Sequence, residues 1–334
     1  MTGPPPIRQA ALALAAAVLC ALTAERRPVE HGRRGSPGDW AGRGGPVFGT
    51  AAYAQEPQQH APSTLAVLPF DGPTGEVEWV ATAVADLLSS AFTRSLGFEV
   101  VERSKLEELL TAPRRDGGLD DESRQRLRTV AKADYVLVGQ ATLADGKLTL
   151  RALLVEAQTG RRVSEAESEG SLADLAQVTG TLAKQLAARM GMPIGAEWSQ
   201  RPLVPGVGLS ALEGYARGCR SLSQGDYSDA LAALTRVTRS AATFVLAHVA
   251  LAKTYDMLGE QEHALACYRQ ALRAAEGPHE RRHLAARVIK MARRVHDQDP
   301  GEEAQRALEE ALRLEREAQL AIADALRASL RDEP

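Results

Sequence analysis

Two spacings of apolar residues along the chain predict two folded regions of different class. Short apolar runs at 63–70, 98–101 and 135–139 predict buried strands, and apolar residues at helical spacing follow the first run. Beyond residue 209 only helical spacing continues. We therefore predict an α/β domain at 63–192, a linker at 193–208 and an all-α domain at 209–334.

The elements predicted for the first domain follow the order β-α-β-α-α-β-β-β-α. Helices separate the early strands, so these strands need crossover connections. The turns Asp145-Gly146 and Thr159-Gly160 join the later strands as hairpins. We therefore expect a mixed sheet, flanked by helices.

The all-α region contains an internal repeat. The segment GDYSDALAALTRV starts at Gly225, and GEQEHALACYRQA starts at Gly259, 34 residues later. This is the period of the tetratricopeptide repeat, in which small residues let paired helices approach and large ones fill the space beside them. The small and large positions are filled by Gly218, Ala230, Ala264, Tyr255 and Tyr268.

Two further helices are predicted at about 279–295 and 302–330, and they differ in charge. Residues 281–294 carry six positive charges and no acid, whereas 297–317 carry eight acids and three arginines. The basic helix is compatible with contact to anionic lipid or nucleic acid, or with a solvated face. We favour an antiparallel hairpin in which the two helices neutralise each other. The net charge of −3 gives no global basic field, and we expect no nucleic-acid partner.

The N-terminus has the pattern of a targeting segment. Arg8 precedes an uncharged apolar run at 10–24, which has the length of a signal-peptide core. Arginines follow this run and resist translocation, so a cleaved signal peptide and an uncleaved membrane anchor at 1–24 both stay open. Residues 25–62, rich in Gly, Pro, Arg and Gln, predict a disordered linker. We expect an exported protein, periplasmic or associated with the outer membrane.

Three stretches of the first domain resemble a known family. They are LAVLPF (65–70), FEVVERSKLEELL (98–110) and ADYVLVGQATLADGKLTLRALLVEAQTGRRV (133–163). They are similar to the CsgG/FlgO/TolB-N-terminal group of bacterial envelope domains. The resemblance implies an assembly or accessory role in the cell envelope, without catalytic residues to transfer. A curli-type secretion component or a pore-associated subunit is the alternative from the same family.

One catalytic motif competes with a binding role. His279-Glu280-Arg281-Arg282-His283 is an HExxH sequence, which on a helix places two histidines for zinc and a glutamate as general base, and Glu303 is a candidate third ligand. Two arginines beside the histidines oppose a divalent cation. We favour a first helical turn with exposed histidines over a zinc-dependent hydrolase. We therefore expect no metal, no cofactor and no enzyme activity.

The favoured hypothesis is a non-enzymatic envelope scaffold that binds a protein partner in the groove of its repeats. By register the groove presents Tyr215, Cys219, Lys253 and Asp256. The identity of the partner and a homo-oligomeric state stay open.

Overall fold

The chain folds into a five-stranded sheet with helices, followed by a series of helical hairpins. The computed structural model describes residues 63–73, 75–109, 119–190, 192, 203–298 and 301–331, which belong to one compact unit. The expected targeting segment at 1–24 and linker at 25–62 lie outside the described residues, as does most of the expected linker at 193–208.

The sheet has the predicted mixed topology. Its strands lie in the order β2-β1-β3-β4-β5, with β1 parallel to β2 and to β3 and with antiparallel pairing from β3 to β5. Gly146 and Gly160 turn the chain with positive φ angles of 76° and 72°, which favour glycine. The strand bounds are β1 (Thr64–Val67), β2 (Glu99–Val100), β3 (Tyr135–Ala144), β4 (Lys147–Glu156) and β5 (Arg162–Ser171).

Helices cover both faces of the sheet around β1 and β3. Ala66 and Val136 are buried against the α3–α4 side with Leu106 and Leu127, whereas the alternate residue Leu65 is buried on the opposite side. On that opposite side, α2 contacts β1 and β3, and α5 contacts β4 and β5. The helices of this region are η1 (Gly75–Val77), α2 (Trp79–Leu96), α3 (Arg103–Leu109), α4 (Asp121–Thr129), η2 (Leu172–Asp174) and α5 (Leu175–Arg189).

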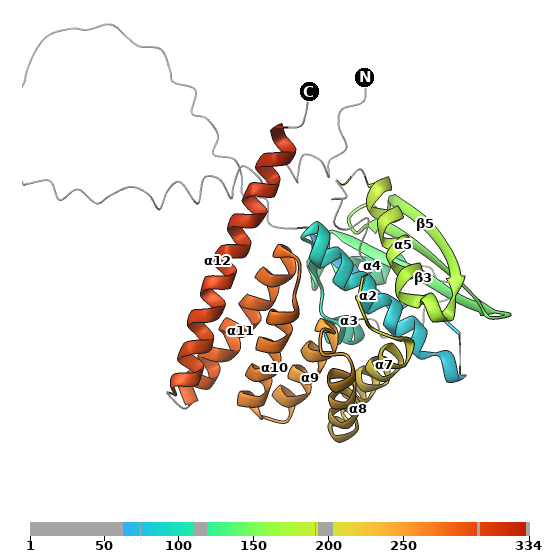
Figure 1. The fold of residues 1–334 in the computed structure, drawn as a ribbon. Helices are drawn as coiled ribbons and strands as arrows, with labels where there is room; N and C mark the ends of the chain where they lie inside the picture. The colour runs from blue at the N-terminus through green and yellow to red at the C-terminus, as the bar shows by residue number, and fades with distance from the viewer. Residues whose placement is uncertain are drawn as a thin grey trace, which may run out of the picture. The chain divides into compact units, whose positions relative to one another are not determined.

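Paired antiparallel helices form the rest of the structure, and each packs against the next (Figure 1). The fold class predicted from the sequence is therefore confirmed. Within the described residues, no helix combines the length and the apolar character needed to cross a membrane. The helix bounds are α7 (Leu209–Gln224), α8 (Tyr227–Ser240), α9 (Val245–Met257), α10 (Gln261–Ala274), α11 (Pro278–Gln298) and α12 (Glu302–Arg331).

The turns of the first two hairpins are equivalent at a spacing of 34 residues. Gly225 and Gly259 adopt φ angles of 84° and 81°. After the first glycine, the Asp226 N–H donates to the carbonyl of Ser221 at 2.9 Å. After the second, the backbone N–H of residue 260 donates to the carbonyl of residue 255, also at 2.9 Å. The repeated sequence therefore forms the same turn twice, as its period predicts.

The small positions of the repeat bring the helices close together. A Cβ atom built on Gly218 of α7 would lie 2.7 Å from Cγ of Leu234 in α8, so only glycine fits without displacement. Ala230 and Ala264 are fully buried, and Tyr268 is 6% exposed. The roles predicted for these residues in helix packing agree with their positions.

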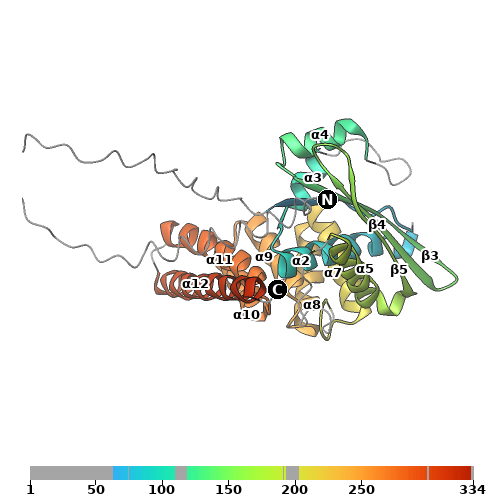
Figure 2. The ribbon, with the colours of Figure 1, turned by 90° about the horizontal axis from the view of Figure 1, so that it is seen from above.

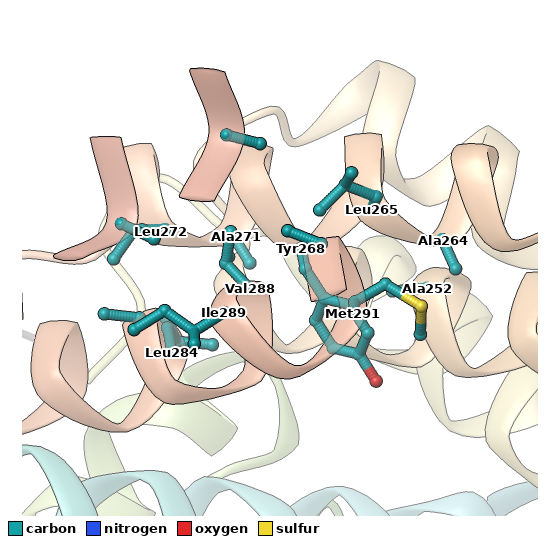
Figure 3. Close-up of a cluster of buried hydrophobic side chains, with 14 of the residues drawn as sticks. Ala252, Ala264, Leu265, Tyr268, Ala271, Leu272, Leu284, Val288, Ile289 and Met291 are labelled. Carbon is teal, nitrogen blue, oxygen red and sulfur yellow. The ribbon is translucent and has the colours of Figure 1, made fainter. Parts of the chain in front are cut away.

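An apolar seam joins α11 to α12 and to α10. Figure 3 shows Tyr268 and Leu272 of α10 facing Leu284 and Val288 of α11. Buried alanines of α12 complete the same cluster, which explains the hairpin that we predicted from charge. They are Ala304, Ala307 and Ala311.

The charges of this last hairpin also pair with the preceding helices. Arg294 of α11 pairs with Asp256 of α9 at 2.9 Å, and Glu310 of α12 pairs with Arg269 of α10 at 3.1 Å. The antiparallel hairpin is present, but these two ion pairs tie it to the second repeat. Mutual neutralisation of α11 and α12 is therefore an incomplete account of their charges.

The close approach of α7 and α8 generates a stability prediction. We expect Gly218→Val to lower the free energy of unfolding by about 1–3 kcal/mol, because the added carbons displace Leu234. The measurement is chemical denaturation followed by circular dichroism. Arg217→Val adds the same side chain at an exposed neighbouring position of α7 and should change stability by at most about 0.5 kcal/mol. Equal effects of the two substitutions would show that the glycine is not required for packing.

Candidate protein-binding site

Helix α2 lies between the sheet and the helical repeats (Figure 2). One side of α2 contacts β1 and α5, and α2 also contacts α7 and α11. We call the side of the repeats that faces α2 and the segment before α3 the inner surface. It is defined by Tyr215 and Cys219 of α7, Lys253 of α9 and Arg287 of α11.

A buried tyrosine makes the central polar contact of the inner surface. The Tyr215 hydroxyl donates to a carboxylate oxygen of Asp86, on α2, at 2.9 Å. The other oxygen of Asp86 accepts from the Arg103 guanidinium. Burial, and next the Asp86 carboxylate, raise the pKa of Tyr215 well above its ordinary value. Burial opposes the charge of Arg103, but Asp86 outweighs this effect and raises the pKa of the guanidinium.

Cys219 lies one helical turn after Tyr215 and in the same environment. Burial, and next the Asp86 carboxylate, raise the pKa of its thiol to about 12. A thiol of this pKa is protonated and a poor nucleophile at neutral pH. Its place beside Tyr215 and Asp86 therefore indicates a packing role.

A second polar contact involves the segment between β2 and α3. Glu102 accepts from Arg287 of α11 at 2.8 Å, and Lys253 lies 3.7 Å from the same oxygen. Burial raises the pKa of Glu102, but Lys253 and Arg287 outweigh it and lower the pKa overall. Burial, and next the charge of Arg287, lower the pKa of Lys253. The Glu102 carboxylate thus interacts with two cations, one from α9 and one from α11.

Further ion pairs lie at the two ends of the inner surface. At one end, Arg220 of α7 pairs with Glu78, which precedes α2, at 3.1 Å. At the other end, Asp256 pairs with Arg294 within the repeats. The Asp256 side chain is 31% exposed, so it borders solvent.

The structure brings three of the four predicted groove residues toward the α/β region. Tyr215, Cys219 and Lys253 face Asp86 or Glu102, whereas Asp256 faces α11. Their role in binding a separate partner stays a prediction. The sequence analysis did not identify Asp86 and Glu102, because isolated polar residues of this kind usually face solvent.

The histidines of the HExxH sequence differ from our expectation of exposed side chains. His279 lies against Gly97, at the end of α2, where a Cβ atom would lie 2.8 Å from the imidazole. Burial and Arg282 lower the pKa of His279 to about 4, and burial and Arg287 lower that of His283 to about 4. The sequence did not predict this environment, because the apolar residues of α11 face α10 and α12, whereas the histidines lie on another side of the helix.

The glutamate of the same sequence is buried. Glu280 is 7% exposed, and burial raises the pKa of its carboxyl, although Arg94 opposes the shift. In the part of the chain that the structure describes, no three His, Cys, Asp or Glu side chains are grouped to hold a metal ion. The candidate third ligand, Glu303, pairs with Arg269 at 3.3 Å.

Comparison with known proteins gives distant structural similarity only. No protein-family model matches the sequence, and no curated protein matches it. The C-terminal domain of LpoB from Salmonella enterica is 20% identical with a TM-score of 0.28; the match covers 33% of this chain and 84% of that one. Lipoprotein GNA1162 from Neisseria meningitidis is 19% identical with a TM-score of 0.24, over 33% and 81% of the two chains.

TolB from Acinetobacter baumannii is also similar in structure over part of its chain. It is 13% identical with a TM-score of 0.30, and the match covers 40% of this chain and 30% of that one. The similarity to all three proteins is thus restricted to a third to two fifths of the chain.

The half-buried histidines generate a prediction about pH. Their folded-state pKa of about 4 lies below the unfolded value of about 6.5, so the unfolded chain binds more protons between these values. We therefore expect the free energy of unfolding to fall as the pH drops from about 6.5 toward 4, by about 1–2 kcal/mol for each imidazole. Denaturant titrations at pH 7.5 and pH 5 measure the loss.

A double substitution tests whether the two histidines cause this loss of stability. His279→Gln/His283→Gln should flatten the pH dependence, because neither side chain then gains a proton. His263→Gln, at an exposed position of α10, should leave it unchanged. A double variant with the full pH dependence would show that other groups cause it.

Proposed function

We propose that this protein is a non-enzymatic scaffold of the cell envelope, which binds another protein through its helical repeats. The observation that carries the proposal is the pair of equivalent hairpins at a 34-residue spacing, whose inner surface already holds a helix. Tetratricopeptide-like repeats expose such a surface because each hairpin can bury its apolar face only by stacking on the next.

The envelope location in this proposal rests on the sequence. The apolar run at 10–24 with Arg8 before it is typical of a segment that directs export or anchors a chain in the membrane. The stretches at 65–70, 98–110 and 133–163 resemble envelope domains, and their strands and turns belong to the observed mixed sheet. An assembly or accessory role is in keeping with both features.

The chemistry of the inner surface favours an α-helix as ligand. Tyr215 supplies a rigid side chain with one polar atom, and Lys253 and Arg287 supply cations. Tyr215 contacts a carboxylate of a helix laid across the repeats, Asp86 of α2, whereas Lys253 and Arg287 contact the carboxylate of Glu102, before α3. Asp256 lies at the exposed margin, next to Met257, which is 59% exposed. This margin is where we expect a separate protein to make its first contacts.

Site-specific photo-crosslinking tests the proposal in the full chain. A photoreactive phenylalanine analogue replaces Met257, and a matched one replaces Leu320, an exposed residue of α12. In intact envelopes we expect one protein to form an adduct at position 257 and not at 320. Asp256→Arg should reduce this adduct by about five-fold or more, because it reverses a charge at the contact.

The control keeps the same charge change away from the inner surface. Glu262→Arg lies on the exposed side of α10 and should leave the adduct at position 257 unchanged. An adduct that is insensitive to Asp256→Arg, or equally strong at position 320, would refute binding through the inner surface.

A further inference from the structure

The contacts across the inner surface are arranged with all the acids on one side. The α/β region contributes Glu78, Asp86 and Glu102, whereas the repeats contribute hydrogen-bond donors and cations. Charge complementarity of this kind fixes the register of a bound element and rejects ligands of the wrong charge. The donors are Arg220, Tyr215, Lys253 and Arg287.

The first two acids define a spacing that a helix can reproduce. Glu78 and Asp86 are eight positions apart, which corresponds to about 12 Å along a helix. Arg220 pairs with Glu78, and Tyr215 donates to Asp86. Both donors belong to a single helix, α7, on which they lie five positions apart. A second helix with carboxylates at the same spacing therefore meets the same donors.

The opposite side of α2 belongs to the core of the α/β region. Val84, Leu87 and Leu88 are at most 1% exposed. Separation at the inner surface therefore moves α2 together with the sheet and leaves the helix folded. The contacts described across this surface are made by polar and charged groups, and interfaces between regions of one chain resemble transient ones. The ion pairs of Glu78 and Glu102 are partly exposed, and pairs of this kind contribute little net stability, because solvent weakens their attraction.

We infer that α2 is an internal ligand that closes the inner surface, and that the partner presents an amphipathic helix with two carboxylates eight positions apart, which replaces it. This inference rests on the proposed function and adds the chemical class of the partner and the element with which it competes. Glu102 is the third acid that holds the inner surface closed, since it pairs with both Lys253 and Arg287.

Cys219 is a built-in reporter of closure in the full chain. It lies beside Tyr215 and Asp86 at the inner surface, whereas Cys267 packs against the apolar cluster of α10 and α11. With Cys20→Ser in the background, a maleimide labels these two thiols, and mass spectrometry gives each rate. Release of α2 should accelerate labelling of Cys219 alone, and unfolding should accelerate both.

The closing carboxylates are removed without touching the core. In Glu78→Gln/Glu102→Gln, we expect Cys219 labelling to rise by about ten-fold or more, with Cys267 unchanged. Glu99→Gln/Glu108→Gln is the matched control, because it removes two exposed acids of the same region. It should leave both rates unchanged.

A synthetic peptide then tests the class of ligand. The probe is a fluorescent, capped Ala/Lys helix with Glu and Asp eight positions apart, and its control carries Gln and Asn there. By fluorescence anisotropy, we expect the acidic peptide to bind the Glu78→Gln/Glu102→Gln protein about ten-fold more tightly than the unsubstituted protein. The control peptide should bind neither.

The outcomes separate the inference from the function on which it rests. Equal peptide affinity for the two proteins, or unchanged labelling of Cys219, would overturn the inference. If the adduct at position 257 still depends on Asp256 in that case, the proposed function stands. If that adduct is also absent, both are overturned.

Discussion

Helix α2 is packed on two sides, and this double packing sets the relation between the sheet and the repeats. Val84 and Leu88 bury its apolar side, whereas Asp86 meets Tyr215 on the other. The buried side chains remove apolar surface from water and fix α2 on the sheet. The repeats therefore meet a helix that is already folded and oriented, and their inner surface has to satisfy its polar groups.

The elements of the fold were predictable because short stretches of sequence specify them. Asp145-Gly146 and Thr159-Gly160 mark hairpins through residues that tolerate positive φ, and the alternation along Leu148 and Leu150 marks a strand with a buried side. Gly225 and Gly259 mark the same turn twice. Each signal is local, so it needs no knowledge of what packs against the element.

The surroundings of the site were only half predictable. The 34-residue register placed Tyr215 and Lys253 on one surface of the repeats, but it contains no information on Asp86, which lies 129 residues before Tyr215. Opposite charges predicted that α11 pairs with α12, but the sequence left His279 and His283 as polar residues without a partner. His279 lies against the end of α2, and His283 lies near Glu102, so both environments arise only in the complete fold.

Two kinds of contact thus hold different parts of the chain. The seam around Leu284 and Val288 is apolar, close-packed and insensitive to charge, so α11 and α12 stay joined to the second repeat. The contacts of Asp86 and Glu102 are polar, and the desolvation of the charged groups offsets part of their attraction. We therefore expect the molecule to separate first where charges meet. If the repeats bind a partner as we propose, the division that matters for binding follows the inner surface, because opening there would expose donors that suit a carboxylate-bearing helix.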